Sequence, residues 1–132
     1  MALNISYKDS QFSIGDIVRV HQKIQEDAKT RIQVFEGTVM AISGQGSSKS
    51  FTVRRIGAGN IGIERIFPIL SPVIDKVEVK TIGRVRRSKI YFIREKSARE
   101  LAEITRPKEA RAANKAGKPK KSSAKRKKSK KK

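Results

Sequence analysis

The chain has 132 residues, a length that allows one small domain with a tail. Its 32 Lys and Arg outnumber 12 Asp and Glu, and the resulting formal net charge of +20 indicates a polyanionic partner. With no Cys and a single His, the sequence excludes disulfides, thiol chemistry and a histidine cluster for a metal. No apolar run reaches the ~18 residues of a membrane helix, and Met1–Gln11 lacks the apolar segment of a signal peptide. An aromatic content of 5% argues against base stacking as the main binding mode.

Alternating apolar and polar residues predict two strands in the first third of the chain. The first runs from Asp16 to Ile24 and the second from Arg31 to Ile42. Gly37 lies in the middle of the second strand and predicts a bulge or a sharp bend, which the corners of small barrels require. The composition of residues 43–50 (SGQGSSKS) predicts an exposed loop.

Four further strands are predicted over residues 51–56, 61–67, 73–82 and 85–94, with a turn at Gly83. Six short strands separated by turn signals favour a small antiparallel barrel or sandwich. We therefore expect an all-β fold, and an SH3-like or OB-like barrel suits this length.

A short helix is expected after the last strand. Ser97 and Glu100 have the spacing of a capping box, and Leu101 and Ile104 then share one helical face. The helix should cover residues 98–104 and end before Pro107. We place a domain boundary there, which divides the chain into a folded body, 1–106, and a tail, 107–132.

The tail holds 13 Lys and Arg, one acid, and no Val, Ile, Leu, Phe or Tyr. Such a segment buries nothing that could offset the entropy of the chain, so we expect it to be disordered alone. A phosphate backbone is the favoured target for a run of one sign. A solubilising segment is one alternative, and an anionic membrane is another, although the tail has no large side chain to insert.

Residues 57–62 (GAGNIG) match the Gly-x-Gly-x-x-Gly pattern of dinucleotide sites. That site requires a helix to follow, whereas residues 61–67 have a strand pattern. We expect a glycine-rich hairpin connection instead. Its bare backbone could also lie close to an RNA backbone.

Catalytic and metal sites have little support. General acid–base or two-metal chemistry needs carboxylates paired in one site. The carboxylates of the predicted strands and turns are Asp16, Glu36, Glu64 and Asp75, and a mixed surface accounts for all four. His21 lies among charges on an outward strand face, so we expect it to contact solvent or RNA rather than a metal.

The densest basic segment of the body lies between Gly83 and Arg94. Its basic residues occupy both odd and even positions and would therefore point to both faces of a strand. Because a half-buried strand tolerates charges on one face only, we expect the first half of this segment to be exposed as an edge or a protruding ribbon. Arg54, Arg55 and Arg65 form a second basic set earlier in the chain. The alternative to an RNA-binding role for these residues is that they are scattered, solvated surface charges. The residues expected to contact RNA phosphates are Arg54, Arg55, Arg65, Arg84, Arg86, Arg87, Lys89, Arg94, Lys120, Lys121, Lys125, Arg126, Lys127 and Lys128.

Five segments between Phe12 and Arg94 follow the order found in one family. They are 35–39 (FEGTV), 51–55 (FTVRR), 62–68 (GIERIFP), 71–72 (SP) and 83–91 (GRVRRSKIY). In this order the chain resembles the bacterial large-subunit ribosomal protein L-nineteen family.

The resemblance implies an SH3-like barrel, no catalytic activity and no cofactor. It implies a structural role in the cytoplasmic ribosome, with the barrel bound to large-subunit (23S) rRNA at the subunit interface and contributing to an intersubunit bridge. The implied partners are small-subunit rRNA and ribosomal proteins L-fourteen and L-three, with no membrane and no small-molecule substrate. Family members often have a longer N-terminal helix and no such tail, so contacts made by those ends are not carried over.

Two alternatives remain beside an rRNA-binding protein. From composition alone, a nucleoid DNA-binding protein fits almost as well, because an Ala/Lys/Pro/Ser tail also suits duplex DNA. A processing or modifying enzyme has no visible catalytic constellation. The order of the five segments favours the ribosome.

Overall fold

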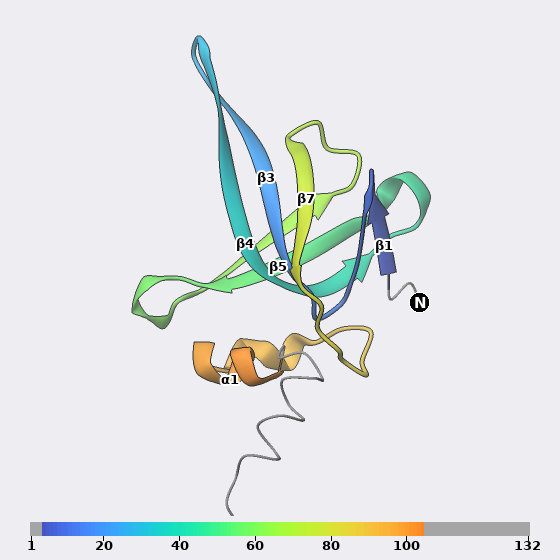
Figure 1. Ribbon diagram of the computed structural model, residues 1–132, viewed down its shortest axis with the longest axis vertical. Coiled ribbons are helices and arrows are strands. Elements are labelled where there is room, and N and C mark those ends of the chain that lie inside the picture. The colour runs from blue at the N-terminus through green and yellow to red at the C-terminus, as the bar shows by residue number, and fades with distance from the viewer. Residues whose placement is uncertain (1–3, 105–132) are drawn as a thin grey trace, which may run out of the picture.

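The structure is a computed structural model and describes residues 4–104, so the predictions for the tail lie outside the described residues. Strands dominate this part of the chain, and one α-helix closes it (Figure 1). The elements are β1 (Asn4–Tyr7), β2 (Ser10–Ser13), β3 (Ile17–Glu26), β4 (Lys29–Ser43), β5 (Ser50–Ile56), β6 (Gly62–Pro68), β7 (Ile74–Thr81) and α1 (Ala98–Ile104), with short 3-10 helices η1 (Gly46–Ser48), η2 (Ala58–Asn60) and η3 (Tyr91–Glu95).

Five strands form one antiparallel sheet in the order β6-β5-β4-β3-β7. The β3–β4 hairpin extends beyond its neighbours as a long arm, and α1 lies at the opposite end of the molecule (Figure 1). β1 and β2 form a separate hairpin, which the sequence analysis missed. This hairpin is fixed to β7 because the Tyr7 hydroxyl donates to the Ile74 carbonyl at 2.7 Å and the Ser10 hydroxyl donates to the Val77 carbonyl at 2.6 Å.

The bulge expected at Gly37 is present in β4 but lies two residues further along the strand. β4 pairs with β3 up to Thr38 and with β5 from Thr38 onward, and the β4–β5 register shifts between Val39 and Ala41. A Cβ atom on Gly37 would lie 2.5 Å from the Arg54 carbonyl oxygen, so only glycine allows β5 to approach this closely.

Closure of the sheet into a barrel is not confirmed. β6 and β7 are the outer strands of the sheet, and within residues 4–104 they do not pair with each other. The mostly-β class with a short C-terminal helix is confirmed.

The core is a row of packed aromatic rings continued by aliphatic side chains. Phe12 packs edge-on against Phe51 at 5.0 Å between centroids, Phe51 lies 5.4 Å from Phe67, and Phe67 lies 5.9 Å from Phe35. All four are buried. The row links β2, β4, β5 and β6, so burial of these rings holds both sheets together.

The sixth strand predicted over residues 85–94 is wrong. Lys89 makes a single bridge with Ala41, and residues 91–95 form η3. Ile90 and Ile93 are fully buried, and their spacing of three residues is that of a 3-10 turn rather than of a strand. The apolar residues of this segment therefore anchor a helical turn to the sheet.

The C-terminal helix is confirmed with its predicted bounds. The Ser97 backbone N–H donates to the Glu100 carboxylate at 3.0 Å, and the Glu100 N–H points back at the Ser97 hydroxyl at 3.5 Å. This reciprocal contact is the capping box expected from the sequence. Leu101 is buried and fixes α1 on the body.

Candidate nucleic-acid interface

The segment Gly83–Lys89, called the basic loop below, is anchored at both ends. At its start, the Gly83 N–H donates to the Asp16 carboxylate at 2.8 Å. Asp16 is 3% exposed, and its other oxygen accepts from the Ser13 N–H at 2.7 Å. At its end, the N–H of Ile90 donates to the Met40 carbonyl at 3.0 Å. The loop is therefore fixed on β4 and on the turn before β3.

Four cations of the basic loop are exposed: Arg84, Arg86, Arg87 and Lys89. Among the described residues none of the four has an ion-pair partner. Within residues 4–104, eight cations elsewhere in the body have carboxylate partners, whereas the loop places four cations without such partners within seven residues, so it carries a concentrated positive charge. Such a surface attracts a polyanion.

A second basic site lies on β5 and β6 at the end of the aromatic row. The guanidinium carbons of Arg55 and Arg65 lie 5.0 Å and 5.1 Å from the centroid of the Phe35 ring. Arg65 also donates to the Gln22 side-chain oxygen at 2.9 Å. Both arginines are exposed, and stacking on the ring limits their rotamers while leaving donors free for a ligand.

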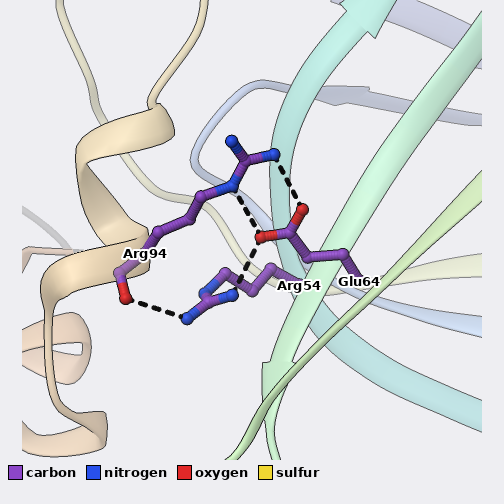
Figure 2. A network of polar contacts seen from close by, with 3 residues as sticks. All are labelled: Arg54, Glu64 and Arg94. Carbon is purple, nitrogen blue, oxygen red and sulfur yellow. Dashed lines mark hydrogen bonds and ion pairs between the residues drawn. The ribbon is translucent and has the colours of Figure 1, made fainter.

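Arg54 and Arg94, in contrast, bind a carboxylate of the protein and connect elements of the fold (Figure 2). Arg54 is 9% exposed and contacts Glu64 at 2.8 Å and the Arg94 carbonyl at 3.1 Å. Arg94 binds both oxygens of Glu64 at 2.9 Å. The network joins β5, β6 and η3, so it orients the segment that follows the basic loop.

The two guanidinium groups stabilise the ionised Glu64 carboxylate. The hydrogen bond from Arg94 is the main cause of the lowered pKa of Glu64, and Arg54 adds to it against the opposing effect of burial. The same carboxylate raises the pKa of Arg94 further. The pair therefore remains charged at every physiological pH.

The other carboxylates considered as catalytic candidates serve the fold or neighbouring cations. Glu36 binds Arg19 at 2.7 Å and also pairs with Lys80, while Asp75 pairs with Lys23 at 2.9 Å. Within residues 4–104, no group of three or more His, Asp or Glu could hold a metal ion. The side chain of His21 is 14% exposed and lies 3.3 Å from Glu78, which gives it a protein partner on the sheet.

The Gly57–Gly62 loop is a hairpin connection, as expected. The Gly57 N–H donates to the Ile61 carbonyl at 2.8 Å, and the loop passes through η2 into the strand β6. A pyrophosphate site of the dinucleotide type would need a helix at this point.

The sequence analysis missed Tyr91 and Phe92. Both are exposed, and each has an arginine over its ring: Arg94 at 4.9 Å from Tyr91 and Arg87 at 5.9 Å from Phe92. The Ile90–Ile93 spacing could have revealed them, because a turn with three residues per repeat turns the two residues between its anchors outward.

The tail residues Lys120, Lys121, Lys125, Arg126, Lys127 and Lys128 are not among the described residues. For residues 4–104, no helix has the length and apolarity needed to cross a membrane.

A small, mostly-β protein with such a basic loop has a charge distribution that is typical of polyanion-binding proteins. Residues 2–106 match the family model for ribosomal protein L19, and the chain belongs to this family, which is one of ribosomal proteins rather than enzymes. Membership confirms the resemblance seen in the sequence and places the chain among bacterial, cytoplasmic ribosomal proteins.

Several curated relatives are called large ribosomal subunit protein bL19. The chain is 57% identical over 86 residues to that of Persephonella marina, a match that covers 65% of this chain and 64% of the relative. It is 53% identical over 85 residues to that of Thermosipho africanus, covering 64% and 74%, and 48% identical over 89 residues to that of Wolinella succinogenes, covering 67% and 75%. The chain thus spans less than two thirds of the Persephonella protein.

Proposed function

We propose that the protein is a structural component of the bacterial large ribosomal subunit that binds rRNA phosphates through the basic loop. The observation that carries this proposal is the set of four exposed cations of the loop, which lack counterions among the described residues. Arginine suits the task because its planar fork donates two parallel hydrogen bonds to one phosphate.

The anchoring of the loop supports the same role. A disordered cation run pays an entropic cost when it binds, whereas the basic loop is already held by Asp16 and Met40. Arg55 and Arg65 form the second proposed contact with RNA. Arg54 and Arg94 leave the set of proposed contacts, because both donate to Glu64 and those donors are no longer available to a phosphate.

The finer features of this role are proposed on family membership. They are an SH3-like arrangement of the bent sheet, a position at the subunit interface, and a contribution to an intersubunit bridge. The partners proposed with them are large-subunit (23S) rRNA, small-subunit rRNA, and ribosomal proteins L-fourteen and L-three. The tail cations are proposed to add sequence-tolerant phosphate contacts.

The test is the triple variant Arg84→Ala/Arg86→Ala/Arg87→Ala in the full chain. We expect at least about tenfold weaker binding to large-subunit rRNA and a salt slope of log K that is shallower by about 2 to 3, because three phosphate contacts are lost. The fold should be unchanged, since all three side chains are exposed.

A charge-matched control replaces three lysines elsewhere: Lys23→Ala/Lys76→Ala/Lys80→Ala. These lysines have carboxylate partners, so their loss should weaken binding much less although the net charge falls equally. Equal effects of the two triples would mean that net charge alone drives binding, and the basic loop would not be the site.

A further inference from the structure

The distribution of aromatic residues is uneven. The chain has two tyrosines and five phenylalanines. Five of these seven rings are buried, whereas Tyr91 and Phe92 are 44% and 38% exposed. The exposed rings are adjacent and lie one residue beyond the basic loop, so the exposed aromatic surface of the protein lies close in the chain to the four cations of that loop.

The two rings are held outward by the fold. Ile90 and Ile93 on either side of them are fully buried, and η3 has the three-residue repeat that places both anchors on the core. The turn is further tied to the sheet by the Ile90 N–H bond to Met40. Tyr91 and Phe92 thus have fixed backbones, which reduces the entropy lost when a ligand stacks on them.

Arginines support both rings. The Arg94 guanidinium lies 4.9 Å from the Tyr91 centroid and is itself held by two bonds to Glu64 (Figure 2). The Arg87 guanidinium, from the basic loop, lies 5.9 Å from the Phe92 centroid. A planar cation beside an aromatic ring is a surface on which a nucleobase stacks well, because every base has a π face.

We infer that Tyr91 and Phe92 form a stacking site for unpaired nucleobases of the RNA whose phosphates bind the basic loop. This inference rests on the proposed function and deepens it, since it makes the preferred ligand a single-stranded or bulged segment rather than a continuous duplex. In RNA helices the bases are already stacked and shielded, and only unpaired bases can turn out onto a protein ring. Arg94 acts here as a positioning residue for Tyr91, not as a phosphate ligand.

A protein partner could also cover exposed aromatic side chains. The charge argues for RNA, because Arg84, Arg86, Arg87 and Lys89 would all be brought into that interface without counterions from residues 4–104. Phosphates beside the stacked bases would supply those counterions.

The experiment uses the full chain and two probes: a single-stranded RNA oligonucleotide of about 12 nucleotides with a central 2-aminopurine, and the blunt duplex formed with its complement. Stacking on the protein should quench the 2-aminopurine fluorescence of the single strand. The variant Tyr91→Leu/Phe92→Leu should lose this quenching and bind the single strand about 5- to 100-fold more weakly, with little change for the duplex.

The matched control is Tyr91→Phe/Phe92→Tyr, which changes the same two positions and keeps both rings. It should retain the quenching and the affinity of the unchanged protein. Absence of quenching with the unchanged protein would overturn the inference, as would an equal effect of the leucine variant on both probes. Unchanged single-strand affinity of the leucine variant would also overturn it and would point to a protein partner.

The Arg84→Ala/Arg86→Ala/Arg87→Ala variant separates the two proposals. It should weaken binding to both probes, because phosphates are present in each. If it does so while the leucine variant has no effect, the stacking site fails and the phosphate site stands. If the arginine variant binds both probes as tightly as the unchanged protein, the proposed phosphate site in the basic loop is wrong.

Discussion

The carboxylate of Asp16 accepts a hydrogen bond from the backbone N–H of Gly83 at 2.8 Å, across 67 residues of sequence. This contact lies immediately before the arginines of the basic loop and connects it to the turn that begins β3. The position of the proposed RNA site thus depends on one buried carboxylate of the fold.

Replacing Asp16 with Ala should lower the free energy of unfolding by about 2 to 4 kcal/mol. The substitution leaves the N–H groups of Ser13 and Gly83 without their acceptor, and each unsatisfied buried donor costs about 1–3 kcal/mol. Urea unfolding measures the change, and Asp9→Ala, at an exposed position, is the control. A loss equal to that of the control would show that the carboxylate does not hold the loop.

Gly83→Ala should also destabilise the protein, by about 1–3 kcal/mol. A Cβ atom at this position would lie 2.0 Å from the Gly15 carbonyl oxygen, and that oxygen is backbone that cannot rotate away. Gly57→Ala is the comparison, because the nearest atom to its Cβ would be the flexible end of Ile63 at 3.1 Å, and the nearest backbone atom, the Ile61 carbonyl oxygen, would lie at an ordinary contact distance of 3.6 Å. Thermal unfolding of both variants checks the prediction, and similar melting temperatures would contradict the close approach.

The network around Glu64 should make stability depend on acid pH. Because Arg94 and Arg54 lower the folded-state pKa of Glu64 below its ordinary 4.5, the stabilisation is fully present above that value and is lost as the pH falls through the folded-state pKa. Glu64→Gln should therefore cost at least about 1 kcal/mol at pH 7 and progressively less below pH 4.5. Urea unfolding across this range, with Glu95→Gln as control, measures the difference. A gap between Glu64→Gln and the unchanged protein that stays constant with pH would contradict this account.

Residues 107–132 should contribute RNA affinity rather than stability. The buried apolar side chains of the described core lie between Ile5 and Leu101, so the fragment 1–106 should melt within about 8 °C of the full chain. If roughly six of the 13 tail cations engage phosphates, the full chain should have a salt slope of log K steeper by about 4 to 5. RNA titrations at several salt concentrations decide this, and equal slopes would show that the tail does not touch RNA.

Periodicity predicted the strands of the sheet and the final helix well, because alternation and a capping box are local signals. It failed for residues 85–94, where Ile90 and Ile93 are anchors of a 3-10 turn and β-branched composition concealed the repeat of three. The β1–β2 hairpin was missed because its burial depends on long-range contacts, such as that of Tyr7 with Ile74.

Sequence reasoning about the site identified basic residues but not their partners. Arg54 and Arg84 are equally basic in the sequence, yet cross-strand pairing gives Arg54 the Glu64 carboxylate, while no carboxylate of the described residues reaches Arg84. Which cation is free is a tertiary property. The exposure of Tyr91 was hidden for the same reason.

In the proposed function, the basic loop holds this chain in the large ribosomal subunit. The most direct measurement is co-sedimentation of the tagged full chain, and of its Arg84→Ala/Arg86→Ala/Arg87→Ala variant, with large subunits through a moderate salt wash after treatment with deoxyribonuclease. We predict that the unchanged chain stays with large subunits and that the variant is depleted from them. A chain that instead follows DNA, and is released when the DNA is digested, would contradict the account and identify a nucleoid protein.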